Sequence, residues 1–197
     1  MNIREIRSQI VTAADKLCEM LELIEKGFME NKPEILAEAI KRENEINETE
    51  KILIRNILEL SKTSDKKKEL VALEQMIETL ERMGDEGASI IERIEVKICE
   101  KLLFSDLDVV QFNETYCATQ DSVTLMRDFL KKNSSALKEK VINNGFRVKE
   151  LVERYRKEHA ERLVKGLGTP MGANMYFDML DFTGNLARHS SNMVKLV

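Results

Sequence analysis

The fold is decided by the stretch at residues 3–28, which reads IREIRSQIVTAADKLCEMLELIEKGF. Its apolar side chains recur at steps of three and four residues: Ile3, Ile6, Ile10, Ala13, Leu17, Leu21, Ile24 and Phe28. This spacing places them on one face of an α-helix about 40 Å long. The pattern stops at Pro33. The stretch therefore predicts a long amphipathic helix that buries one face against other helices.

The rest of the chain carries five further apolar stripes with the same spacing, separated by short polar breaks. The breaks lie at residues 31–33, 61–65, 105–106, 133–135 and Gly166-Leu167-Gly168-Thr169-Pro170. Proline at a first helical turn, glycine after a last turn and serine, threonine or aspartate at a cap are typical of helix ends. We therefore expect six helices. The third should be capped by Asp65 and reach Leu103.

A short duplication links the two halves of the chain at an offset of 100 residues. The matching pairs are Leu80-Glu81 with Leu180-Asp181 and Gly84-Asp85 with Gly184-Asn185. This predicts an all-α protein of two tandem three-helix bundles, residues 1–104 and 105–197, packed side by side. The heptad-like stripes also permit a plain coiled coil, although the breaks divide each half into segments that fold back on one another.

Composition and charge exclude several classes of protein. The 31 basic and 35 acidic residues give a net charge of -4, and no basic block interleaved with aromatics suggests a nucleic-acid partner. Cys18, Cys99 and Cys117 lie far apart without a C-x-x-C pair, which is typical of a reducing compartment. The sequence also contains no apolar run typical of a membrane span and no secretion signal. We expect a cytoplasmic protein.

Two carboxylates stand out as a candidate metal site. Glu81 and Asp85 are four residues apart, so both project from one side of a helix. Like charges at this spacing cost roughly 0.2–0.5 kcal/mol, and a bound cation would reverse that sign. Hard oxygen ligands suit iron, manganese, magnesium or calcium better than a structural zinc. The alternative is a solvated face on which Arg82 pairs with Glu78.

The segment Leu80-Glu81-Arg82-Met83-Gly84-Asp85, repeated in weaker form 100 residues later, resembles the signature of the PhoU family of phosphate-uptake regulators. The resemblance covers the whole chain and implies two three-helix repeats, each with an acidic motif that binds metal. The implied metal is iron, with zinc, manganese, magnesium or calcium as alternatives. Its ligands fall on Glu81 and Asp85 in the first repeat and on Asp181 and Asn185 in the second.

The second repeat departs from this pattern. Asn185 replaces a carboxylate and so removes a charge from any cation site. His189 lies one turn further along the same stripe, where it is either a substitute ligand or a packing residue.

The middle helices differ as well. Glu43 and Glu45 keep the first repeat acidic, whereas the stretch taken as their counterpart, residues 146–150, is mainly basic. Arg147 and Lys149 either pair with Asp181 in place of a metal or are solvated charges. The first repeat is therefore the stronger metal candidate.

The resemblance also implies a role. No P-loop, G-x-S-x-G or H-E-x-x-H motif occurs, and neither His159 nor His189 follows a glutamate at the di-iron spacing, so we expect no enzymatic activity. We expect a regulator of phosphate uptake that contacts the phosphate transporter, the histidine kinase of the phosphate-starvation response, or both. It would reach the membrane only through a partner, and long helix faces favour a homodimer.

Two alternatives remain. The run His159-Ala160-Glu161-Arg162-Leu163, followed by Gly166 and Pro170, is similar to the PhoU-like domain of sodium/phosphate cotransporters. The chain would then be a regulatory domain acting on such a cotransporter. The other alternative is a metal-free helical adaptor.

Overall fold

The structure is a computed structural model that describes residues 1–167 and 169–196, in which the chain forms six long α-helices. They are α1 (Ile3–Glu30), α2 (Pro33–Ser61), α3 (Lys67–Cys99), α4 (Asp106–Lys132), α5 (Ser135–Val164) and α6 (Pro170–Met193). The predicted all-α class is confirmed. Among these described helices, none is long and apolar enough to cross a membrane.

Most helix ends follow the capping chemistry expected from the sequence. Asn2 and Ser105 each form a capping box, in which the side chain accepts a backbone N–H and a nearby carboxylate accepts the cap's own N–H. Asn31 and Asn133 end α1 and α4 in the left-handed conformation, with φ of 51° and 47°. Thr169 caps α6 by accepting the N–H of Gly172.

Two predicted helix ends are wrong, and both belong to α3. Lys66, not Asp65, is its N-cap residue, and it makes no side-chain capping hydrogen bond. The helix ends at Cys99 because Lys101 turns the chain with a φ of 50°, so Leu103 lies in the connector and is 95% exposed. The apolar spacing continues past the helix end as far as Leu103, so it gave no indication of this turn.

The connection from α5 to α6 follows the predicted rule where the structure describes it. Gly166 has a φ of 77°, which favours glycine, and Pro170 is the first residue of α6. Gly168, named with this break, lies outside the described residues.

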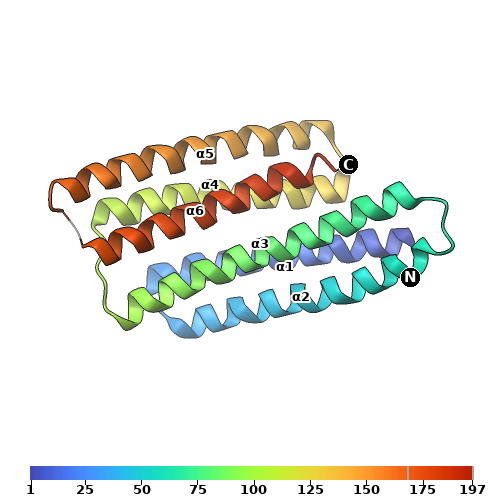
Figure 1. Cartoon of the computed structure of the whole chain (residues 1–197), viewed down its shortest axis with the longest axis horizontal. Coiled ribbons are helices and arrows are strands. Elements are labelled where there is room, and N and C mark those ends of the chain that lie inside the picture. Colours follow the sequence, from blue (N-terminus) through green and yellow to red (C-terminus); the bar gives the residue numbers. More distant parts are fainter. Residues whose placement is uncertain (168, 197) are drawn as a thin grey trace.

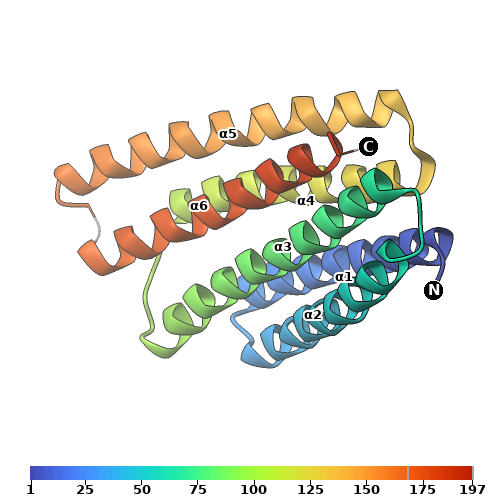
Figure 2. The same cartoon turned by 45° about the vertical axis from the view of Figure 1, so that its right-hand side comes forward.

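The helices pack as two sets of three (Figure 1), with α1, α2 and α3 in mutual contact and α4, α5 and α6 likewise. The turned view in Figure 2 shows α3 beside α6, and this pair together with α1 and α4 joins the two sets. Within the described residues, α2 and α5 contact only helices of their own half. The predicted boundary at residues 104 and 105 falls in the connector between α3 and α4.

The joint between the halves is apolar and closely packed. Phe28 and Phe112 meet edge to face, with ring centroids 4.9 Å apart, and the fully buried Tyr116 donates its hydroxyl proton to the Leu21 carbonyl at 2.9 Å. The buried side chains of all six described helices belong to one continuous core.

Candidate functional site

The candidate acidic site lies where α2 crosses the motif on α3. Glu81 is half-buried and Asp85 is exposed. Between them Gly84 presents no side chain, so Glu43 of α2 lies across it, with its Cγ 3.7 Å from where a Cβ would stand. The structure therefore brings Glu43 to the same place as the predicted pair.

The surroundings of Glu81 carry an excess of negative charge. Burial raises the pKa of Glu81, and the carboxylates of Asp85, Glu50 and Glu43 raise it further against a smaller opposite effect of Arg82. The ion pair between Arg82 and Glu78, predicted as the alternative to a metal site, is observed, with Arg82 Nη2 3.6 Å from Glu78 Oε2. That ion pair is exposed and leaves the Glu81 face acidic.

One residue of the site was missed by the sequence argument. Asn47 donates its amide proton to Glu43 Oε1, while its own Oδ1 is buried without a hydrogen-bond partner among the described residues. A buried carbonyl oxygen with no donor is unusual, and it is a ligand type that hard cations accept. Glu43, Asn47 and Glu50 are spaced by four and three residues, so the helical period was the available signal.

Glu45, in contrast, is directed away from this site. Its carboxylate lies 3.1 Å from Lys16 Nζ and 3.0 Å from Arg42 Nη1. The hydrogen bond from Lys16 is the main reason that the pKa of Glu45 falls below its usual value. Its role is therefore to join α2 to α1.

The oxygen donors of Glu43, Asn47, Glu81 and Asp85 match a hard cation in chemistry. Across residues 1–167 and 169–196, however, no three histidine, cysteine or acidic side chains converge as metal ligands. Mutual repulsion keeps carboxylates apart when no cation lies between them. A metal at this site stays a prediction, and binding would require these side chains to close on the ion.

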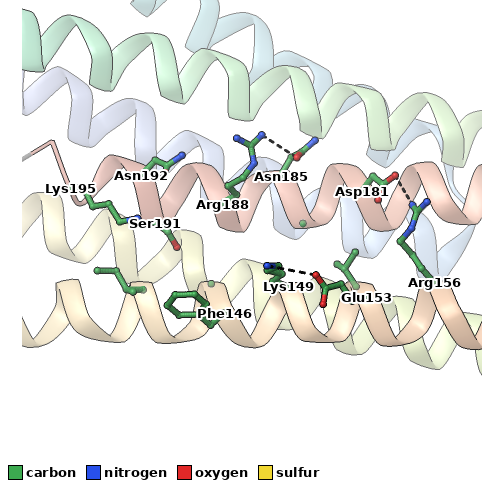
Figure 3. A pocket seen from close by; sticks show the side chains of 14 residues that line it. Phe146, Lys149, Glu153, Arg156, Asp181, Asn185, Arg188, Ser191, Asn192 and Lys195 are labelled. Carbon is green, nitrogen blue, oxygen red and sulfur yellow. Dashed lines mark hydrogen bonds and ion pairs between the residues drawn. The ribbon is translucent and has the colours of Figure 1, made fainter.

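The corresponding place in the second half has a different composition. Asp181 forms an ion pair with Arg156 of α5, in which Asp181 Oδ2 lies 2.6 Å from Arg156 Nη1 (Figure 3). Asn185 accepts a hydrogen bond from Arg188 at 3.1 Å. His189 lies against α3, with its Nε2 4.0 Å from Glu86 Oε1, and burial is the main cause that lowers its pKa. The three predicted ligands lie on one face of α6, where Asp181 pairs with Arg156 and both Asn185 and His189 approach Glu86 of α3.

The helix register explains this difference. Gly184 packs against Val152, as Gly84 packs against Glu43, so Val152 occupies the position of Glu43. Arg156 follows Val152 by four residues, as Asn47 follows Glu43, so Arg156 corresponds to Asn47. The equivalence drawn from sequence to residues 146–150 is therefore wrong by about two turns.

Of the two alternatives for Arg147 and Lys149, pairing with Asp181 is wrong, and both residues are exposed. The carboxylate of Asp181 is paired by Arg156 rather than by Arg147 or Lys149. Lys149 instead lies 3.7 Å from Glu153 on the exposed side of α5. The second half thus carries a fixed side-chain cation where the first has an unpaired amide oxygen.

A buried polar cluster near the carboxyl end of α5 was also missed. Asp108 Oδ1 accepts hydrogen bonds from Arg162 Nη2 at 2.6 Å and from His159 Nδ1 at 2.8 Å, and the His159 ring stacks on Tyr176. Burial alone would raise the pKa of Asp108, but hydrogen bonds from Ser105, His159 and Arg162 hold it below its usual value. This cluster joins α4, α5 and α6, and its histidine has a structural role.

Comparison with known proteins identifies the relatives of this arrangement. Residues 10–94 match the family model described as PhoU domain, a range that contains Glu43, Glu81 and Asp85. No curated protein matches the chain. Two solved structures share its fold at 12–13% sequence identity, which shows the fold alone.

The first structure is PhoU from Pseudomonas aeruginosa, with a TM-score of 0.90 over 98% of this chain and 93% of that one. The second is the phosphate transport system regulatory protein PhoU from Streptococcus pneumoniae, with a TM-score of 0.86 over 98% and 92%. The resemblance read from the acidic motif is confirmed over residues 10–94, and for the rest of the chain the solved structures show the fold.

Proposed function

The chain carries a PhoU domain over residues 10–94 and folds as solved PhoU proteins do, and from this premise we propose that it is a non-enzymatic regulator of phosphate transport. The family match over the acidic motif carries this proposal. The structural relative from Streptococcus pneumoniae is named as a regulatory protein of a phosphate transport system.

The proposed regulator binds a metal cation through Glu81 and Asp85 of α3, assisted by Glu43 and Asn47 of α2. Iron is the metal that the family resemblance implies, and zinc, manganese, magnesium and calcium are the alternatives. Two observations support the site: the raised pKa of Glu81, which reflects burial and crowded carboxylates, and the buried Asn47 Oδ1 without a partner. When bound, the cation would neutralise these carboxylates. Its binding would then draw α2 and α3 together on this face.

The second half is proposed to hold no metal of its own. Asp181 already has the Arg156 guanidinium at 2.6 Å, so a cation would have to displace a charge-assisted hydrogen bond. Asn185 contributes no charge, and His189 contacts α3 instead. One metal-binding face per chain is expected.

The proposed regulation works through protein contacts rather than chemistry. The partners implied by the resemblance are a phosphate transporter, a phosphate-sensing histidine kinase, or both. The protein would act in the cytoplasm as a homodimer and reach the membrane only through these partners. Light scattering that shows only monomer at micromolar concentration would rule out the dimer, and coprecipitation with a sodium/phosphate cotransporter would favour the alternative role as its regulatory domain.

Metal content of tag-free protein, measured by mass spectrometry, tests the site. The wild type should hold iron or another divalent metal after reconstitution, and Asp85→Asn, which imitates the second half, should lose most of it. Asp181→Asn is the matched control because its carboxylate is already paired, and its metal content should equal that of the wild type. Equal metal in all three proteins, or none in any, would refute the proposed ligands.

Phosphate uptake tests the function separately from the metal. Cells that lack the protein should take up radiolabelled phosphate at an altered rate, and the wild-type chain should restore it. The double variant Glu81→Ala/Asp85→Ala should fail to restore it. If this variant restores uptake fully and its metal content and stability are unchanged, the chain acts as a metal-free adaptor. If the wild type itself has no effect, the role in phosphate transport is wrong.

A further inference from the structure

The outer face of the second half contains a long groove between α5 and α6. Its volume is about 670 Å³, and Figure 3 shows the side chains that line it. The lining extends from Ile142 to Arg156 on α5 and from Asp181 on α6 to Lys195 in the turn after that helix. At 1.5 Å per residue, the α5 wall is about 21 Å long, or four helical turns.

The groove has an apolar side. Phe146 is 64% exposed and lies at the groove, as Figure 3 shows, and the partly exposed Ile142 and Val152 line the same wall. A single exposed apolar residue is ordinary on a protein surface. Three of them along one concave strip are typical of a contact surface.

The groove also carries an excess of positive charge, although the whole chain has a net charge of -4. Two of its cations are balanced, since Lys149 pairs with Glu153 at 3.7 Å and Arg156 pairs with Asp181 at 2.6 Å. Arg188 donates a hydrogen bond to the neutral amide of Asn185 at 3.1 Å, and its charge also acts on the Glu86 carboxylate of α3. Within the described residues, neither Arg188 nor Lys195 has a carboxylate at ion-pair distance.

One polar group at the floor of the groove has no hydrogen-bond partner among the described residues. The hydroxyl oxygen of Ser191 is buried and has no hydrogen-bond partner in the part of the chain that the structure describes. It lies beside Gly145, whose missing side chain leaves room for it, and in Figure 3 it is directed toward α5.

We propose that the α5–α6 groove binds an acidic amphipathic helix of a partner protein. The apolar face of that helix would cover Ile142, Phe146 and Val152, and its carboxylates would meet Arg188 and Lys195. A straight strip of four turns matches a helix laid along α5 and α6, whereas a small anion would occupy one end only. The helix would form a fourth member of the α4–α6 bundle. This inference rests on the proposed function, because it specifies the partner contact of that regulator.

A displayed library of 18-residue helical peptides, selected on the full chain, tests the proposal. One stripe of each peptide is Leu, Ala or Phe, and the remaining positions are randomised among Glu, Lys, Gln and Ser. We expect the selected peptides to be rich in Glu and to bind more weakly as salt concentration rises. Selection of Lys-rich peptides, or of none, would overturn the proposal.

Groove variants then locate the binding, measured by fluorescence anisotropy with a selected peptide. Phe146→Ala and Arg188→Glu change exposed side chains, so the fold should persist, and each should weaken binding at least tenfold. The matched controls are Val110→Ala on α4 and Arg55→Glu on α2, both exposed, and these should stay within twofold. Equal binding by groove and control variants would place the peptide elsewhere and refute the assignment.

Two other occupants give different results. If Phe146→Ala converts a dimer to a monomer in light scattering, the groove is covered by a second copy. If Arg188→Glu abolishes binding to phosphatidylglycerol vesicles and no peptide binds, the groove meets lipid. Either result overturns the proposal. Asp85→Asn should leave peptide affinity unchanged, so failure of this inference is distinguishable from failure of the metal site.

Discussion

Replacing Asp108 by alanine should destabilise the second half strongly. The carboxylate is 9% exposed and is bonded by Arg162, which is 18% exposed, and by His159, which is 7% exposed. Its removal leaves a partly buried guanidinium without this counter-charge, which costs at most about 3–5 kcal/mol. The lost capping interaction with Ser105 adds about 1 kcal/mol. The expected loss in free energy of unfolding corresponds to a fall in Tm of roughly 10 °C for a chain of this size.

Urea unfolding followed by circular dichroism measures this loss, with Asp106→Ala as the matched control. Asp106 lies in the same first turn but is exposed, so its removal should cost at most about 1 kcal/mol. The double variant Asp108→Leu/Arg162→Met removes both charges and should be more stable than Asp108→Ala. If Asp108→Ala is no less stable than Asp106→Ala, the buried cluster contributes nothing and the reasoning fails.

The same comparison has a defined pH dependence. The folded-state pKa of Asp108 lies below its ordinary value of about 3.8, so the unfolded state binds this proton more readily. Its contribution is fully present well above the ordinary value and is lost as pH falls through the lower, folded-state value. The stability gap between wild type and Asp108→Ala should therefore be constant near neutrality and narrow in acid.

Three further predictions concern the site and the joint between the halves. The pKa of Glu81 is raised above about 4.5, so the folded state prefers the protonated side chain and loses stability as pH rises through the raised value. Metal-free Glu81→Gln, which carries no charge, should therefore resist urea better than wild type at pH 7 but not at pH 4. The double variant Arg156→Asn/Asn185→Asp restores the first-half ligand types in the second half and should raise bound metal per chain. Tyr116→Phe removes the hydrogen bond to the Leu21 carbonyl and should cost about 1 kcal/mol in urea unfolding.

The sequence was sufficient for the helices because their signals are local. Ile6, Ile10 and Leu17 repeat at the helical period, and all three are buried. Asn2 and Ser105 act as caps because their own side chains reach the first free N–H groups. The end of α3 was misjudged because Leu103 keeps the apolar spacing beyond a turn at Lys101 that no proline or glycine marks.

The candidate site was only half visible in the sequence. Glu81 and Asp85 lie on one helix, so their spacing alone places them together. Glu43 reaches them from α2 over Gly84 and holds Asn47 by a hydrogen bond, and this depends on the relative register of two packed helices. No pattern within one helix contains that information.

The sequence by itself determined six amphipathic helices, their breaks and the acidic motif of the first half, because periodicity, capping and i,i+4 spacing are properties of single helices. Only the tertiary structure decided which residues face that motif. It placed Asn47 beside an uncompensated acidic face in one half and Arg156 on Asp181 in the other. It also made a groove of α5 and α6, since charge and apolar surface from two helices combine only when packing fixes their distance and register.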